Sequence, residues 1–143
     1  MKDITFVQQP TRNSCVSACL SMVTGIDVIT VINQFHSDYH DRETTIYDYL
    51  DYHGVEYLVP DIRSMERDHL YENNTYMITV PSLGTKGGLH AIVASVDANG
   101  ALEVFDPQKG RPDALHYVAP DDPAEGEGEV PMSAWIVDAI FPH

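Results

Sequence analysis

Apolar and polar residues follow a helical spacing over much of the first half of the chain. Residues 15–23 are apolar around most of the circumference that a helix would have, which predicts a buried helix. Asn13 and Ser14 are candidate N-caps for this helix, and Gly25 is the expected stop. Further helices are predicted from Asp27 through Phe35, from Thr45 to Gly54 and over residues 61–71.

Short runs rich in β-branched and aromatic residues fill the second half and predict strands. These runs are residues 55–59, 76–80, 89–97, 101–105, 115–118 and 134–141. Helices first and strands later predict an α+β fold, with the buried N-terminal helix packed on a largely antiparallel sheet. With 143 residues and no repeat or boundary signal, residues 1–143 are expected to form one domain. The stretch 119–131, rich in Pro, Gly and acidic residues, is expected to be an exposed, mobile loop.

The charge of the chain is strongly negative, with 8 Lys and Arg against 22 Asp and Glu and a net charge of −14. Because no basic cluster occurs along the sequence, binding to nucleic acid or to an anionic membrane surface is disfavoured. The same charge favours a basic peptide or protein partner. No apolar run reaches about 20 residues and the N-terminus lacks a signal-peptide layout, so we expect a cytoplasmic protein.

Two cysteines lie one helical turn apart at the start of the chain. Cys15 is placed at the first turn of the predicted helix, where free N–H groups and the positive end of the helix dipole favour a thiolate. Cys19 lies one turn further in and is expected to be part of the core. The pattern therefore makes Cys15 a candidate nucleophile, with a small buried apolar residue as the alternative.

Among the seven histidines, His90 is the candidate base, because it opens the most apolar predicted strand directly after a glycine-rich loop. Asp106 is the candidate acceptor for its second ring nitrogen. A three-residue loop, Ala98-Asn99-Gly100, pairs Asp97 with Ala101 and places Asp106 diagonally opposite His90 on one face of the hairpin. Asp106, which precedes Pro107, could alternatively cap a turn.

Acyl transfer through a thiolate also needs hydrogen-bond donors for the developing oxyanion. The backbone N–H of Cys15 can supply one donor. A side-chain amide shortly upstream can supply another, and both Gln8 and Gln9 are candidates, seven and six residues before Cys15.

Two segments of the sequence carry a resemblance to a known family. Residues 9–23, QPTRNSCVSACLSMV, resemble the N-terminal box of papain-like cysteine peptidases, most closely the peptidases that process double-glycine leaders of bacteriocins. Residues 90–107, HAIVASVDANGALEVFDP, resemble the His…Asp-Pro hairpin of that family. The family places a Gln six residues before the catalytic Cys, which selects Gln9. This chain has Ser14-Cys15-Val16 where family members usually carry Asp-Cys-Gly, and Val16 would narrow the cleft beside the nucleophile.

The resemblance implies a papain-like fold and a hydrolase that cleaves peptide or isopeptide amide bonds without a cofactor. It implies Cys15 as the nucleophile, His90 as the base, Asp106 as the residue that orients it, and Gln9 as an oxyanion donor. A catalytically silent module that binds a protein through an acidic, tyrosine-rich face is the main alternative by class. A deamidase or acyltransferase with the same thioester chemistry is another.

His36 and His40 give a rival interpretation, because two histidines at i and i+4 form half of a zinc site on a helix. No glutamate stands between them at the metalloprotease position. A solvated helix end is therefore the favoured interpretation of this segment, and no metal is expected.

Overall fold

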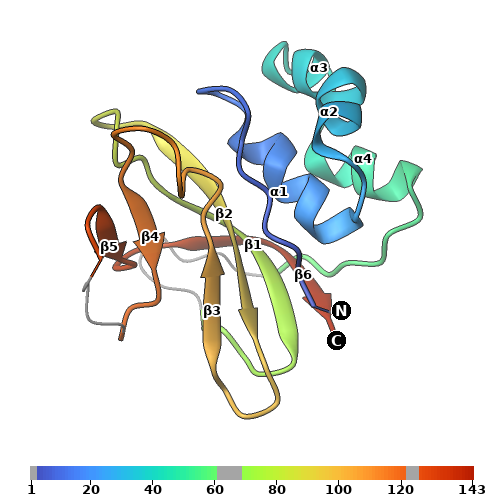
Figure 1. Cartoon of the computed structure of the whole chain (residues 1–143). Coiled ribbons are helices and arrows are strands. Elements are labelled where there is room, and N and C mark those ends of the chain that lie inside the picture. Colours follow the sequence, from blue (N-terminus) through green and yellow to red (C-terminus); the bar gives the residue numbers. More distant parts are fainter. Residues whose placement is uncertain (1–2, 61–68, 122–125) are drawn as a thin grey trace.

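The computed structural model, which describes residues 3–60, 69–121 and 126–143, places a group of helices against a sheet (Figure 1). The helical segments are α1 (Cys15–Thr24), α2 (Val28–Val31), the π-helix η1 (Ile32–His36), α3 (Ser37–His40) and α4 (Ile46–Tyr52). The strands are β1 (Asn74–Pro81), β2 (Leu89–Val96), β3 (Leu102–Phe105), β4 (His116–Val118), β5 (Glu129–Pro131) and β6 (Ile136–Pro142). This order confirms the predicted α+β class.

Helix α1 ends as predicted and begins differently. Gly25 adopts the left-handed conformation (φ 77°) and its N–H donates to the carbonyl of Ser21, which closes the last turn. Ser14 occupies the N-cap position, but its hydroxyl bonds to the backbone of Thr11 instead of the helix. No side chain therefore caps the first turn of α1, and its N–H groups remain available to other acceptors.

The remaining helices begin at capping residues that the sequence indicated. Asp27 accepts hydrogen bonds from the N–H groups of Ile29 and Thr30 at the start of α2. The helical path then continues through η1 and α3 to His40, five residues beyond the prediction. A capping box formed by Thr45 and Asp48 starts α4. The helix predicted at 61–71 falls mostly outside the described residues.

The main sheet has the strand order β3-β2-β1-β6, and every neighbouring pair is antiparallel. The β2–β3 hairpin follows the predicted register, with Val96 paired with Leu102 and the Asp97 N–H bonded to the carbonyl of Ala101. Gly100 is left-handed (φ 83°), as a three-residue loop requires. Continued along the strands, this register places Asp106 beside the start of β2.

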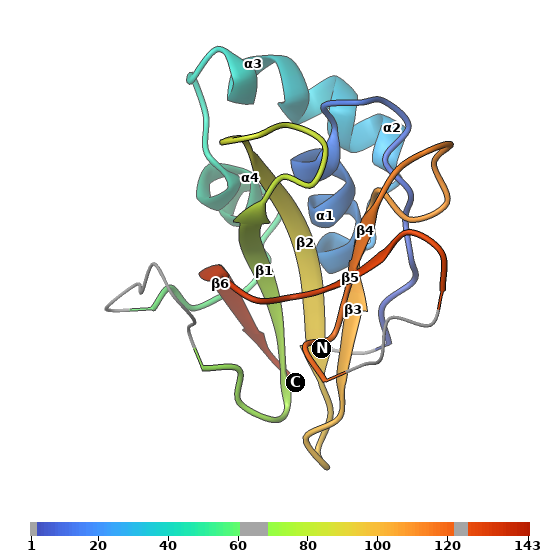
Figure 2. The same cartoon turned by 90° about the vertical axis from the view of Figure 1, so that its left-hand side faces the viewer.

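Both faces of the sheet are buried. On one face, α1 packs on β2, and the core there includes Leu20, Phe35 and Val93. On the other face, Ile92 and Ile78 pack with residues of the β4–β5 side of the molecule. Figures 1 and 2 show the helices and the β4–β5 pair on opposite sides of the sheet. No helix of the described residues has both the length and the apolar character needed to cross a membrane.

Two predictions of secondary structure were wrong in detail. Residues 55–59 form no strand, and only one isolated bridge joins Leu58 to Ile140. Val55 and Tyr57 are partly buried against the core, whereas Leu58 is 58% exposed. The stretch 119–131 is not entirely a loop, because its last three residues form β5, which pairs in parallel with β4. Val130 packs against the core beneath this pair, which explains why residues 129–131 form a strand.

Candidate active site

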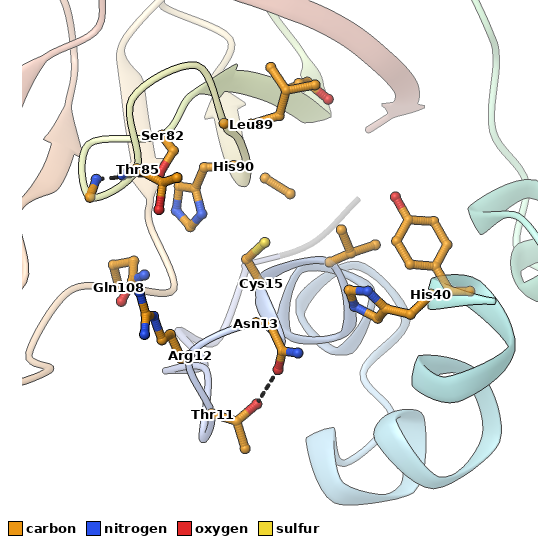
Figure 3. A pocket seen from close by; sticks show the side chains of 16 residues that line it. Thr11, Arg12, Asn13, Cys15, His40, Ser82, Thr85, Leu89, His90 and Gln108 are labelled. Atoms are coloured by element: carbon orange, nitrogen blue, oxygen red, sulfur yellow. Dashed lines mark hydrogen bonds between the residues drawn. The ribbon is translucent and has the colours of Figure 1, made fainter. Parts of the chain in front are cut away.

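A cleft of about 760 Å³ lies over the N-terminal end of α1 and brings together segments that are distant in sequence (Figure 3). Its walls come from the loop before α1, the end of α3, the β1–β2 loop with the start of β2, and the turn after β3. The lining residues are Thr11, Arg12, Asn13, Cys15, Val16, Tyr39, His40, Thr79, Ser82, Gly84, Thr85, Gly88, Leu89, His90, Ala91 and Gln108. The predicted nucleophile and the predicted base therefore share one cleft.

Cys15 is half-buried, and its side chain lies in the middle of the cleft beside the imidazole of His90 (Figure 3). Burial alone would raise the pKa of the Cys15 thiol. The hydrogen bond and the positive charge of His90, with backbone hydrogen bonds from Ala91 and Val16, outweigh burial and lower this pKa below its ordinary value of 9.0. The uncapped first turn of α1 thus contributes the Val16 N–H to the sulfur.

His90 is buried and is bonded to Asp106 through one ring nitrogen. Its Nε2 lies 2.7 Å from Oδ1 of Asp106, which leaves Nδ1 as the nitrogen available to Cys15. Burial lowers the pKa of His90, but the hydrogen bonds and charges of Asp106 and Cys15 raise it from 6.5 to about 9. The two shifts together favour a thiolate on Cys15 beside an imidazolium on His90.

Asp106 is 1% exposed, and three hydrogen bonds hold its carboxylate. Oδ1 accepts from His90 and from the Gln108 N–H (2.9 Å), and Oδ2 accepts from the Tyr117 N–H (2.8 Å). Two backbone donors from two different segments fix the carboxylate, and the carboxylate fixes the ring. The contribution of Tyr117 was not predicted, because it depends on β4 lying against β3 in the folded chain.

Cys19 lies in the core, as expected. It is completely buried, and burial, with the nearby charges of Cys15, Asp106 and Asp138, raises the pKa of its thiol well above 9.0. The two thiols, only one helical turn apart, therefore differ in the chemistry that they can perform: Cys15 favours the thiolate and Cys19 the neutral thiol.

Gln9 does not stand where the sequence interpretation placed it. Its side chain is buried and does not line the cleft, and its Nε2 donates to the carbonyls of Thr11 (2.9 Å) and Arg12 (3.1 Å). Both amide hydrogens are therefore used in holding the loop before Cys15. The spacing between Gln9 and Cys15 does not predict where the Gln9 amide points, because its direction depends on the turn that the loop makes.

Several residues of the cleft were not singled out by the sequence. Asn13 lies beneath Cys15 in Figure 3, and its Oδ1 accepts from the Thr11 hydroxyl (3.3 Å), which leaves its NH₂ group directed away from that bond. Tyr39 lies on the opposite wall; burial, with the charges of Cys15 and Asp138, raises the pKa of its phenol. Asn13 was predicted from the sequence only as an N-cap of α1, although its position two residues before Cys15 already placed it close to the nucleophile.

His36 and His40, the two residues of the rival zinc interpretation, contact each other through their rings. The imidazoles of His36 and His40 have centroids 4.4 Å apart, and burial, with the charge of His40, lowers the pKa of His36. Within residues 3–60, 69–121 and 126–143, no group of three or more His, Cys, Asp or Glu side chains gathers in a way that could hold a metal ion. His116, which was expected to be exposed, is buried.

Comparison with known proteins gives no relative for this chain. Neither a protein-family model, nor a curated protein, nor a solved structure matches it.

Proposed function

We propose that this protein is a papain-like cysteine hydrolase that cleaves peptide or isopeptide amide bonds through a thioester. The observation that carries the proposal is the arrangement of three side chains: Cys15 in the cleft, His90 beside it, and Asp106 bonded to the far nitrogen of His90. A nucleophile, a base and a residue that orients the base is the arrangement that nucleophilic catalysis requires.

In the first half of the reaction, the thiolate of Cys15 attacks the carbonyl carbon of the scissile amide and forms a C–S bond. The tetrahedral intermediate collapses, and the C–N bond breaks. His90, protonated at Nδ1, gives its proton to the departing amine. Asp106 keeps Nε2–H bonded throughout, so the ring cannot turn away or change its tautomer.

In the second half, water attacks the thioester carbonyl, and neutral His90 accepts a proton from it. The C–S bond breaks, the carboxylic acid product leaves, and the Cys15–His90 pair returns to the thiolate and imidazolium form. If an amine replaces water in this step, the same residues transfer the acyl group to that amine, and if ammonia replaces water, they form a primary amide. These steps use Cys15, His90 and Asp106 and require no cofactor.

The oxyanion of each tetrahedral intermediate needs donors at the N-terminal end of α1. The Cys15 N–H is one, since no side chain caps this turn. We assign the second to the side-chain amide of Asn13, which lines the cleft two residues before the nucleophile. Gln9 acts through the loop, because its amide hydrogens hold the carbonyls of Thr11 and Arg12.

The experiment that tests the proposal is a search for the thioester. The protein is mixed with p-nitrophenyl acetate and with a fluorogenic peptide library, and quenched samples are weighed by intact mass spectrometry. We expect an acyl adduct on Cys15 that hydroxylamine removes. We expect turnover to disappear in Cys15→Ala and His90→Ala. Cys19→Ala is the matched control, because it removes a thiol one turn away and should retain turnover.

Two results would contradict the proposal. An adduct that persists in Cys15→Ala would place the nucleophile elsewhere. Wild-type protein that forms no adduct and cleaves no library member would favour a catalytically silent binding module.

A further inference from the structure

The charge inside the cleft is opposite to the charge of the chain. Although the chain has 22 Asp and Glu, none of those that the structure describes is among the residues that line the cleft. The lining residues that can carry a positive charge are Arg12, His40 and His90. Asp106 and Asp138 lie behind the wall and accept hydrogen bonds from His90 and Thr79. Asp106 and Asp113 line an adjoining cavity of about 180 Å³, whose wall shares His90 and Gln108 with the cleft.

Basic residues also belong to three segments that border the cleft, and we call these residues the basic rim: Arg12, Lys86, Lys109 and Arg111. Arg12 lines the cleft, Lys86 lies in the β1–β2 loop between the lining residues Thr85 and Gly88, and Lys109 and Arg111 lie in the turn that begins at Gln108. The one other Lys or Arg of the described residues is Arg42, which follows α3 and does not line the cleft.

Arg12 is the rim residue that reaches the cleft itself. Figure 3 shows its guanidinium on the same flank of Cys15 as Gln108, and His40 on the other flank. Within the described part of the chain, no carboxylate forms an ion pair with Arg12. Its backbone is nevertheless fixed, because its carbonyl accepts from the buried amide of Gln9. A guanidinium carried on an anchored backbone, beside a side-chain amide, suits a carboxylate, which it can bind through two parallel hydrogen bonds.

We propose that the cleft selects substrates with a carboxylate next to the scissile amide, and that Arg12, assisted by Gln108, binds this carboxylate. The inference rests on the proposed function and names its substrate class. The carboxylate can be the C-terminus of a peptide or the side chain of an Asp or Glu, and both present the same group to Arg12. This selection replaces the expectation of a basic substrate, which came from net charge alone. Charges more than about 8 Å away are largely screened at physiological salt, so the groups within the cleft decide selection.

The test uses two alkylating reagents that differ mainly in charge. The Cys15 thiolate attacks the CH₂ carbon of either reagent, forms a C–S bond and releases iodide, so it gains a carboxymethyl group from iodoacetate and a carbamoylmethyl group from iodoacetamide. Their rate ratio at Cys15, measured by mass spectrometry and divided by the same ratio for N-acetylcysteine, reports the preference of the cleft for an anion. We expect a normalised ratio of roughly 10 or more in the wild type, the effect of one charge-assisted hydrogen-bond pair.

Three variants give this ratio its meaning. Arg12→Ala should reduce the normalised ratio to about 1 or below, and Arg12→Lys should restore part of it, because it returns the charge without the planar fork. Arg42→Ala is the matched control: it removes the same unit charge from the chain outside the basic rim, and should keep the wild-type ratio.

Protection against iodoacetamide distinguishes the two sources of the carboxylate. N-acetylglutamine offers a terminal carboxylate, N-acetylglutamate α-amide offers a side-chain carboxylate, and N-acetylglutamine amide is the neutral control. We expect one or both acids to protect Cys15 and the neutral compound to give no protection. The acid that protects Cys15 more strongly identifies the source of the carboxylate.

The outcomes separate this inference from the function on which it rests. If Cys15 reacts readily with both reagents but the ratio is the same in the wild type and Arg12→Ala, the carboxylate inference is wrong and the hydrolase proposal stands. Equal protection by the neutral compound leads to the same conclusion. If Cys15 reacts with neither reagent, the thiolate is absent and both proposals fail.

Discussion

Nε2 of His90 lies 2.7 Å from Oδ1 of Asp106, although sixteen residues separate them along the chain. The β2–β3 hairpin brings them together, because its three-residue loop sets the register of both strands. Each further property of the candidate active site depends on this bond: the orientation of the imidazole, its raised pKa and the lowered pKa of Cys15.

Activity should depend on pH as a bell-shaped curve. Turnover requires Cys15 as the thiolate, whose pKa is lowered from 9.0, and His90 as the imidazolium, whose pKa is raised to about 9. As the pH falls through the pKa of Cys15 the thiolate is protonated, and as it rises through about 9 the imidazolium loses its proton, so kcat/KM should fall on both sides. The profile with the best library peptide checks this. A maximum above pH 10 would contradict it.

Asp106→Asn should remove the negative charge that stabilises the His90 imidazolium. The carboxamide oxygen can still accept a hydrogen bond from a backbone N–H. Without the carboxylate, burial dominates at His90 and its pKa falls from about 9, so the Cys15 thiolate also loses its partner. We expect kcat/KM at pH 7 to fall by about 10² or more. Histidine NMR titration of Asp106→Asn should show the pKa of His90 lowered. An unchanged titration would mean that Asp106 has no part in setting it.

Gln9→Ala and Asn13→Ala should have different effects. Gln9 is buried and donates two hydrogen bonds, so its loss should reduce the free energy of unfolding by about 1–3 kcal/mol. Asn13 is exposed, so Asn13→Ala should leave the melting temperature nearly unchanged and lower kcat by about 10²–10³, the usual effect of removing an oxyanion donor. Thermal unfolding and turnover, measured side by side, decide this. The reverse pattern would return the oxyanion role to Gln9.

Val16 lines the cleft and directly follows Cys15 in the chain, so its side chain takes up space beside the nucleophile. Val16→Gly should widen the cleft there and raise kcat/KM for library peptides with bulky residues, while it destabilises α1 by about 0.5–1 kcal/mol. Val16→Ala is the matched control, since it removes volume without the glycine penalty. If neither variant changes the order in which the library peptides are cleaved, Val16 does not determine specificity.

The parts that sequence predicted are those that local rules determine. Gly25 ends α1, and Gly100 sets the hairpin whose register brings Asp106 to His90. The rest depends on contacts between distant segments. The direction of the Gln9 amide follows from a turn in the loop before α1, and the support of Asp106 by Tyr117 follows from the path of β4.

The basic rim could not be predicted from the sequence either. Its members Arg12, Lys86 and Lys109 are scattered along the chain, and a search for clusters of positive charge in sequence finds none. Only the folding of three separate segments around one cleft brings these stretches of the chain to a common site, with Arg12 in its lining.

The most direct test of the central claim, a Cys15 thiolate held by His90, is the pH dependence of iodoacetamide alkylation with the modified cysteine mapped by mass spectrometry. We predict that Cys15 reacts well below pH 9.0, that Cys19 does not react in the folded protein, and that His90→Ala moves the reactivity of Cys15 up to the range of an ordinary or buried thiol. A Cys15 that titrates in the same way with and without His90 would contradict the account.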